Sequence, residues 1–166
     1  MRIVAVSDTH RNTAQLRRSV RQAVEDGQID VFIHCGDGVQ DLDVVEDILR
    51  TANPSIRIYA VRGNCDLGAF QVPVSDLADL HGVRALITHG HIYDVKHGLG
   101  KLAKAARSLH AALAFFGHTH QPLIAQKHGV TLINPGSLAA WSLTDTVYLE
   151  VLIDGDHPIR ENFIKL

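Results

Sequence analysis

The sequence contains few of the features that stabilise or sort secreted and membrane proteins. Only two cysteines occur among its 166 residues, which is too few for a disulfide framework and typical of a reducing compartment. No apolar run approaches the roughly 20 residues that a membrane span requires, and the run at the N-terminus is too short for a signal peptide. We therefore expect a cytoplasmic protein without membrane contact.

An excess of positive charge is also absent. The chain has 16 Lys and Arg against 18 Asp and Glu, for a net charge of −2, so it lacks the electrostatic pattern of a nucleic-acid-binding protein. We expect no specific nucleic-acid binding, and a phosphate-containing substrate would have to be held by bound metal. Linkers, repeats and low-complexity stretches are missing as well, which favours a single domain over residues 1–166.

The first half of the chain alternates strand-like and helix-like segments. Apolar, β-branched runs predict strands at 2–7, 31–34 and 56–61, and helical spacing predicts a helix after Asn12 and a second from Leu42 to just before Pro54. This β-α-β-α-β order implies a parallel sheet with helices on its faces. Ligands of such sheets bind beyond the carboxyl ends of the strands.

The second half changes character, and the C-terminal third of the chain is predicted to be mostly antiparallel. A hairpin is expected at 77–88, a helix at 99–109, and strands at 112–116, 123–126, 130–133, 147–153 and 159–164, with turns at 127–129 and at Asp154-Gly155. Both halves fit one α/β domain of two packed mixed β-sheets flanked by helices.

Five short motifs follow these strand-like segments, and each carries side chains that bind metals. They are Ser7-Asp8-Thr9-His10, Gly36-Asp37, Gly63-Asn64-Cys65-Asp66, His89-Gly90-His91 and Gly117-His118-Thr119-His120. Carboxylate, amide and imidazole donors suit divalent ions of the first transition row and Mg²⁺. Alternation in an extended segment would put both side chains of Asp8-x-His10, and both of His118-x-His120, on one side. The glycine before three of the motifs allows a tight turn.

Each motif alone has an ordinary explanation. An aspartate at a strand end is also typical of a helix cap, and a single histidine is more often a packed or surface group. The five motifs at successive strand ends favour a common site, because the ordinary reading has to explain each one separately. Two metal ions in one site indicate hydrolysis of a phosphate ester.

In order and wording, the five motifs closely resemble the calcineurin-like metallophosphoesterase superfamily, and within it the small single-domain phosphodiesterases of the YfcE type. The resemblance extends to Asn134-Pro135-Gly136-Ser137 and implies a four-layer αββα sandwich. It also implies two metal ions bridged by Asp37. Mn²⁺ is expected, with Ni²⁺, Fe²⁺, Zn²⁺ or Mg²⁺ as alternatives. One ion would be held by Asp8, His10, Asp37 and His120, and the other by Asp37, Asn64, His89 and His118.

These ligands suggest a phosphodiesterase that hydrolyses small phosphate esters by in-line attack of a metal-bridging hydroxide, with Asn64 helping to neutralise the phosphoryl charge. The alternative is a non-catalytic protein-interaction scaffold of the same fold, like the retromer subunit, in which the metal site is altered. All seven ligand positions are present here, which favours the enzyme. A metallo-β-lactamase-type hydrolase is less favoured because no H-x-H-x-D-H string occurs.

Cys65 departs from many members of the superfamily, which carry at this position a histidine thought to protonate the leaving group. A thiol titrates near 8.5 and is a poorer acid for that task. We therefore expect weak turnover of esters with basic alcohol leaving groups and better turnover of activated aryl diesters. A Cys65→His variant tested across a leaving-group series addresses this point. G-N-C-D also occurs in the YfcE type, so the cysteine does not by itself indicate inactivity.

Three further residues have open roles. His91 either contacts substrate phosphate, supports His89, or is a surface imidazole. Asp66 either orients neighbouring loop groups or caps a turn. Arg11 either reaches a phosphate or, as the favoured reading, is exposed at the start of the first helix.

The sequence does not name the substrate, and without a cap domain the site should be open and permissive. Trp141 and the pair Phe115-Phe116 are expected in the core or an interface rather than at a substrate. Exposed apolar positions are compatible with a homo-oligomer such as a dimer, but no apolar stripe identifies its interface.

Overall fold

Two five-stranded sheets form the centre of the computed structural model, which describes residues 1–141, 146–154 and 160–165. The first sheet has the order β10-β9-β1-β2-β3, and the second has the order β4-β5-β6-β8-β7. The strands are β1 (Arg2–Val6), β2 (Val31–His34), β3 (Arg57–Ala60), β4 (Ser75–Leu80), β5 (Val83–Thr88), β6 (Leu113–Phe115), β7 (Leu123–Lys127), β8 (Val130–Asn134), β9 (Thr146–Leu152) and β10 (Arg160–Lys165).

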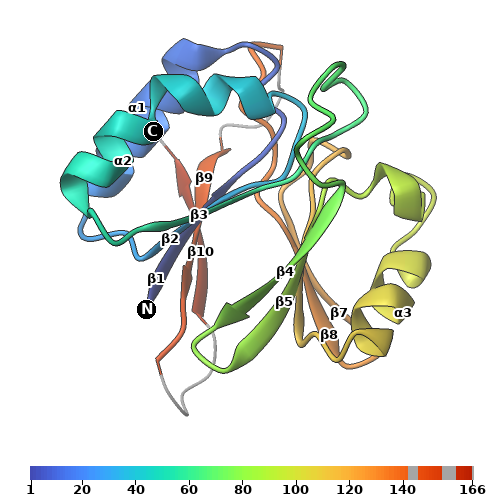
Figure 1. Ribbon diagram of the computed structural model, residues 1–166. Helices are drawn as coiled ribbons and strands as arrows, with labels where there is room; N and C mark the ends of the chain where they lie inside the picture. The colour runs from blue at the N-terminus through green and yellow to red at the C-terminus, as the bar shows by residue number, and fades with distance from the viewer. Residues whose placement is uncertain (142–145, 155–159, 166) are drawn as a thin grey trace.

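Helices cover the outer faces of both sheets, so the molecule has four layers, as the sequence predicts (Figure 1). They are α1 (Thr13–Glu25), α2 (Glu46–Ala52) and α3 (Gly100–Ser108), with short 3-10 helices η1 (Val39–Val44) and η2 (His91–Tyr93). Helix α1 begins where predicted, since the Asn12 side chain accepts the Gln15 N–H. The predicted second helix starts later than expected, because 39–44 form the tighter η1 before α2.

Three apolar clusters correspond to the three interfaces between the layers. Along β1, Ile3 and Ala5 face the second sheet, whereas Val4 and Val6 face α1 and α2. The cluster under α3 includes Leu86 of β5 and Phe116. Strands buried on both faces read as continuous apolar runs rather than as alternating ones, which explains the patterns at 2–7 and 31–34.

The strands at the centre of each sheet are parallel, and the hairpins lie at the edges. Strands β1, β2 and β3 pair in parallel, as do β5, β6 and β8. The C-terminal hairpin of β9 and β10 joins the first sheet beside β1, a pairing that the sequence did not predict. The predicted turn at Asp154-Gly155 and the predicted strand start at Ile159 fall partly outside the described residues.

Parallel strands direct their carboxyl ends to one edge of a sheet. The segments that follow β1, β2, β3, β5 and β6 carry the five motifs, so the fold brings all five to the same end of the sandwich. Within the described residues, no helix combines the length and apolarity needed to cross a membrane.

Candidate metal centre

Six of the seven predicted ligands fall into two groups of donor atoms. Asp8, His10 and His120 form one group, and Asp37, His89 and His118 form the other. Within each group the ligand atoms lie within 4.8 Å of one another. These groups divide the six residues as the resemblance implies, except that Asp37, which the resemblance places in both sets, occurs only in the second group; its bridging role stays a prediction.

Asp8 presents one anchored and one free carboxylate oxygen. It is fully buried, and its Oδ2 accepts the Ser7 hydroxyl at 2.5 Å and the His118 backbone N–H at 3.0 Å. Its Oδ1 has no hydrogen-bond partner and lies 3.2 Å from His120 Nε2 and 3.9 Å from His10 Nε2. The first contacts fix the carboxylate so that the second oxygen faces two imidazoles.

Asp37 has the same arrangement. Its Oδ1 accepts the Cys65 backbone N–H at 2.7 Å, while its Oδ2 lies 3.3 Å from His89 Nε2 and 3.8 Å from His10 Nε2. Burial raises the pKa of Asp37, but the close contact with His89, the charge of His89 and the hydrogen bond from the Cys65 N–H outweigh burial and lower the pKa well below its ordinary value. The group is therefore ionised at neutral pH and suited to bind a cation.

The tautomer of His89 is set by a backbone carbonyl. Its Nδ1 lies 2.8 Å from the oxygen of Cys35, and a carbonyl oxygen only accepts, so Nδ1 carries hydrogen. In the neutral ring the buried, unpartnered Nε2 is then an acceptor that faces two carboxylate oxygens, Asp37 Oδ2 and, at 4.0 Å, Asp8 Oδ1. Buried acceptors in mutual contact require a proton or a cation between them.

Protonation of His89 competes with metal binding. Burial lowers the pKa of His89, but the close contact with the Asp37 carboxylate and the charges of Asp8 and Asp37 outweigh it and raise the pKa. His118 behaves differently, because burial and then His89 lower its pKa to about 4. The donor set of two carboxylates and four imidazoles fits divalent ions, and a bound ion would have to displace the proton from His89.

The carboxylate of Asp66 organises the loop that carries Asp37. It accepts the backbone N–H groups of Asp37, Gly38, Val39 and Gly63 at 2.7–3.0 Å. This is the orienting role that the sequence predicts as one option for Asp66. A catalytic role for the residue stays a prediction.

Two positioning residues in the Asn134–Ser137 segment were not assigned a role from the sequence. The amide of Asn134 donates to the Gly117 carbonyl at 2.9 Å and to Thr119 Oγ1 at 3.0 Å, on either side of His118. The hydroxyl of Ser137 donates to the carbonyl of Asp8 at 3.0 Å. The only available signal was that this segment is part of the family pattern.

The ligand loops are not extended, which corrects the predicted alternation in Asp8-x-His10 and His118-x-His120. Positive φ angles occur at several site residues: Asp8 (52°), His10 (46°), Asp37 (55°), His118 (67°) and His120 (60°). Left-handed backbone at residues other than glycine is strained and concentrates at functional sites. Asp8 and His10 still share one group, as expected, whereas His118 joins Asp37 and His120 joins Asp8, so the shared side holds for the first pair only.

Two of the three motif glycines are explained by neighbouring side chains that lie too close for a Cβ, rather than by a tight turn. A Cβ on Gly63 would lie 2.0 Å from Asp37 Oδ1, and one on Gly117 would lie 1.9 Å from Ser7 Oγ. Gly36 does have the left-handed φ of 93° that the turn argument expects. Each anchored carboxylate oxygen thus has a glycine packed against it.

Three predicted residues lie at the edge of the metal groups. Asn64 is exposed, and its amide lies 3.2 Å from Cys65 Sγ, so its ligand role stays a prediction. Cys65 lies within 4.8 Å of the donor atoms of His10 and Asp37, and burial followed by Asp37 raises its pKa to about 11. His91 packs its ring against His89 and His118 at 5.4 and 6.2 Å, and burial followed by His89 lowers its pKa.

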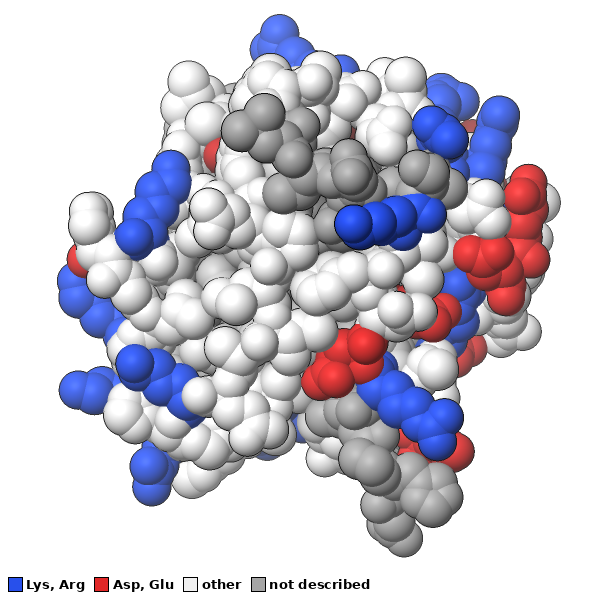
Figure 2. Space-filling view, turned by 180° about the vertical axis from the view of Figure 1, so that it is seen from behind, with Lys and Arg blue, Asp and Glu red and all other residues white. Residues whose placement is uncertain are grey.

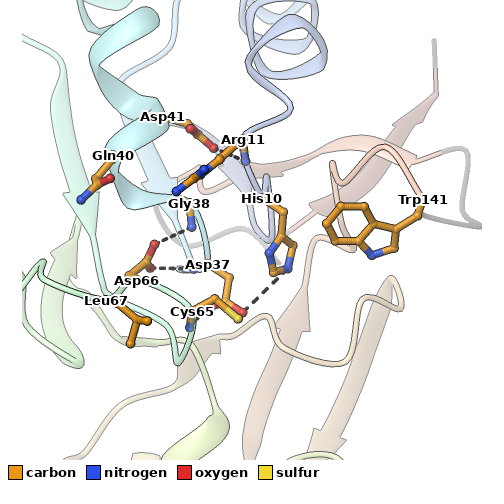
Figure 3. A pocket seen from close by; sticks show the side chains of 10 residues that line it. All are labelled: His10, Arg11, Asp37, Gly38, Gln40, Asp41, Cys65, Asp66, Leu67 and Trp141. Atoms are coloured by element: carbon orange, nitrogen blue, oxygen red, sulfur yellow. Dashed lines mark hydrogen bonds and ion pairs between the residues drawn. The ribbon is translucent and has the colours of Figure 1, made fainter.

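A pocket of about 280 Å³ opens beside His10, Asp37 and Cys65 (Figure 3). Arg11 is exposed and lines it, so it is close enough to the metal groups to serve either predicted role. Phe115 and Phe116 are buried, as expected. Trp141 was expected in the core or an interface; it is not in the core, since it is 63% exposed and forms part of the pocket wall, and the interface alternative stays a prediction.

Charge is dispersed on the face opposite to the view of Figure 1. Figure 2 shows Lys, Arg, Asp and Glu mainly toward the edges of this face, with uncharged side chains at its centre. Among the described side chains of this face, no continuous basic patch is visible.

Comparison with known proteins gives one consistent family. The calcineurin-like phosphoesterase superfamily domain matches residues 1–155. The chain is 31% identical to the probable metallophosphoesterase YsnB of Bacillus subtilis over 83% of this chain and 75% of that protein. It is 27% identical to the phosphodiesterase MJ0936 of Methanocaldococcus jannaschii, over 85% and 86% of the two chains.

Solved structures with a similar fold include a protein described as a predicted phosphoesterase. A conserved uncharacterized protein of Streptococcus pneumoniae, described as a predicted phosphoesterase, superposes with a TM-score of 0.79 at 26% identity and covers 99% of this chain and 88% of its own. A Vps29 variant of Entamoeba histolytica superposes with a TM-score of 0.75 at 19% identity over 100% and 99% of the chains, a likeness of fold alone. The strand-end ligands, the two-sheet architecture and the sequence relatives lead to one conclusion: this chain belongs to the calcineurin-like phosphoesterase superfamily.

Proposed function

We propose that the chain is a phosphodiesterase that works with two divalent metal ions, Mn²⁺ first among Ni²⁺, Fe²⁺, Zn²⁺ and Mg²⁺. The observation that carries this proposal is the pair of donor groups, Asp8 with His10 and His120 and Asp37 with His89 and His118, whose ligand atoms lie within 4.8 Å of one another inside each group. Each group contains a buried atom without a hydrogen-bond partner, Asp8 Oδ1 in the first and His89 Nε2 in the second, and a bound cation would satisfy both. The phosphodiesterase among the relatives supports the choice of substrate class.

The bound ions would supply Lewis-acid activation of water and neutralise charge on the phosphoryl group. The side chains of the protein would position the metal ligands and the substrate. Asp66 and Asn134 hold the loops of Asp37 and His118 through backbone contacts. Asn64 and His91 would contact the substrate phosphate. Cys65, whose pKa is raised, would be a weak proton donor to the leaving group, so activated aryl esters should react best.

Metal analysis combined with an activity matrix tests the proposal. Purified protein loaded with each of the five ions would be assayed on bis-p-nitrophenyl phosphate, cyclic nucleotides and monoesters. We expect about two ions per chain and the highest turnover on the activated diester with Mn²⁺. Asp37→Asn should lower kcat by roughly a hundredfold or more and reduce the bound metal. Asp94→Asn, which changes an exposed acid beside Lys101, is the matched control and should keep both.

The competing candidate is a protein-interaction scaffold, favoured only by the Vps29-like fold. Protein that contains no metal after loading and hydrolyses none of the esters would support the scaffold and contradict the enzyme. We place the proposed enzyme in the cytoplasm, since both cysteines are free and one of them is exposed.

A further inference from the structure

An exposed indole forms one wall of the pocket beside the metal groups. The ring of Trp141 lies 5.1 Å from the ring of His10, with an interplanar angle of 43°, yet 63% of the residue is exposed. Leu67, 86% exposed, lies on the opposite side of the pocket (Figure 3). Large apolar side chains left in water at the mouth of a polar site are typical of ligand-binding surfaces.

Polar side chains complete the pocket between these walls. Gln40 offers both an amide donor and a carbonyl acceptor, and Arg11 offers guanidinium donors. A plain alkyl group could pack on the indole but would leave the polar groups unused. A nucleobase would use both, because it has a flat face that stacks on an aromatic ring and an edge of donors and acceptors.

The size and charge of the pocket favour a small ligand over a nucleic-acid strand. Its volume of about 280 Å³ lies near the lower end for small-molecule sites. The net charge of the chain is −2, whereas proteins that bind the phosphate backbone of a nucleic acid carry an excess of positive charge. One nucleoside beside the metal groups is the ligand that this space suits.

We propose that Trp141 and Leu67 flank a subsite for the base of a nucleoside esterified to the reacting phosphate, so that small nucleoside phosphodiesters are the preferred substrates. This inference rests on the phosphodiesterase function proposed above. The base stacks on the indole, Gln40 and Arg11 contact its polar edge, and the phosphate reaches the group of His10, Asp37 and Cys65 at the inner end of the pocket.

Two diesters with the same leaving group test the subsite. Thymidine p-nitrophenyl phosphate carries a nucleoside where methyl p-nitrophenyl phosphate carries a methyl group. In Trp141→Ala we expect KM for the nucleoside diester to rise about tenfold more than KM for the methyl diester. Trp141→Phe should recover part of this difference. Phe70→Ala removes another exposed aromatic ring, which lies over Arg62 outside the pocket lining, and should leave the ratio of the two KM values unchanged.

The fluorescence of the protein gives a readout that does not need turnover. Trp141 is the single tryptophan of the chain, so its emission reports only this site. Thymidine 5′-monophosphate added to the Mg²⁺-loaded protein should quench the emission saturably, whereas inorganic phosphate and methyl phosphate should not. Equal changes in KM for both diesters, or quenching no stronger than that by inorganic phosphate, would overturn the subsite.

The two proposals fail in different ways. If neither diester is hydrolysed by the metal-loaded protein, the phosphodiesterase function fails, and the quenching by thymidine monophosphate still decides whether the pocket binds a nucleoside. If both diesters are hydrolysed with the same response to Trp141→Ala, the function stands and the subsite is wrong.

Discussion

At the scale of single residues, Asp8 and Asp37 share one arrangement, in which one carboxylate oxygen is anchored and the other is free to bind a cation. Each uses one oxygen to accept a backbone N–H and directs the other toward imidazole nitrogens. The anchored oxygen limits rotation of the carboxylate, so little conformational entropy is lost when a metal binds. A residue behind these loops, His34, is fully buried, and its Nδ1 accepts the backbone N–H of Gly36 at 3.1 Å.

Removing the imidazole of His34 should reduce the acid sensitivity of the chelator-treated protein. Burial lowers the pKa of His34 to about 4, whereas an unfolded histidine titrates near 6.5. Between these values the unfolded state binds more protons, so the free energy of unfolding rises with pH from about 4 to about 6.5 and then levels off. His34→Asn keeps an acceptor for Gly36 and should flatten this rise, as measured by urea unfolding across that pH range.

The matched control is His128→Asn in the exposed turn between β7 and β8, where asparagine tolerates the left-handed φ of 53°. It should keep the slope of the wild-type protein. A His34→Asn protein with an unchanged slope would mean that other groups, such as His118 with its similarly lowered pKa, account for the acid sensitivity alone.

At the scale of elements, the loops at the strand ends and the glycines in them determine how closely the ligand residues approach one another. β1 leads into Asp8 and β6 into Gly117, and the loop after β6 packs directly on the loop after β1. The two loops approach so closely that a single methyl group at Gly117 has no room, since it would lie 2.6 Å from Asp8 Oδ2.

Gly117→Ala should therefore weaken metal binding and lower the free energy of unfolding by about 1–3 kcal/mol, because Asp8 has to move. Metal content after dialysis and urea unfolding would measure the two effects. Gly100→Ala is the control: this glycine begins α3, its nearest neighbour to an added Cβ is Lys127 Cε at 3.7 Å, and alanine favours a helix. Equal metal loss in both variants would contradict the close-approach argument.

The elements and the pairings between neighbouring strands were largely predictable, but the long-range pairings were not. Hydrophobic periodicity and the capping, glycine and proline residues at element ends located the strands and α1, because those signals are local. The placement of the β9-β10 hairpin beside β1 depends on long-range pairing, which no local pattern records. The clustering of the candidate ligands was predictable for the opposite reason: a donor following a strand end is a local signal, and parallel strands bring such donors together. The left-handed backbone at Asp8 and His118 was missed because it is imposed by packing between loops.

At the scale of the whole molecule, the proposed ions join the two sheets. One group combines Asp8 and His10, which follow β1, with His120, which follows β6, and the other combines Asp37 of the first sheet with His89 and His118 of the second. Separation of the sheets would therefore break both coordination sets.

Metal should accordingly stabilise the fold. At free metal concentrations of about 100 times Kd the gain is about 2.7 kcal/mol, which should raise Tm by several degrees for a domain of this size. Thermal unfolding followed with Mn²⁺ and then with excess chelator measures the difference. Asp37→Asn should respond far less to either addition. A wild-type Tm that is insensitive to chelator would argue against ions that span the two sheets.

The position of β1 in the middle of its sheet has a consequence for biosynthesis. β1 pairs on one side with β2 and on the other with β9, whose residues are made about 150 positions later, with Arg2 opposite Leu152. Every proposed ligand, in contrast, is present once the ribosome has added His120. Synthesis from the N-terminus therefore delivers the complete ligand set before the strand that closes the first sheet, so the nascent chain carries all of its metal donors before it has a finished fold.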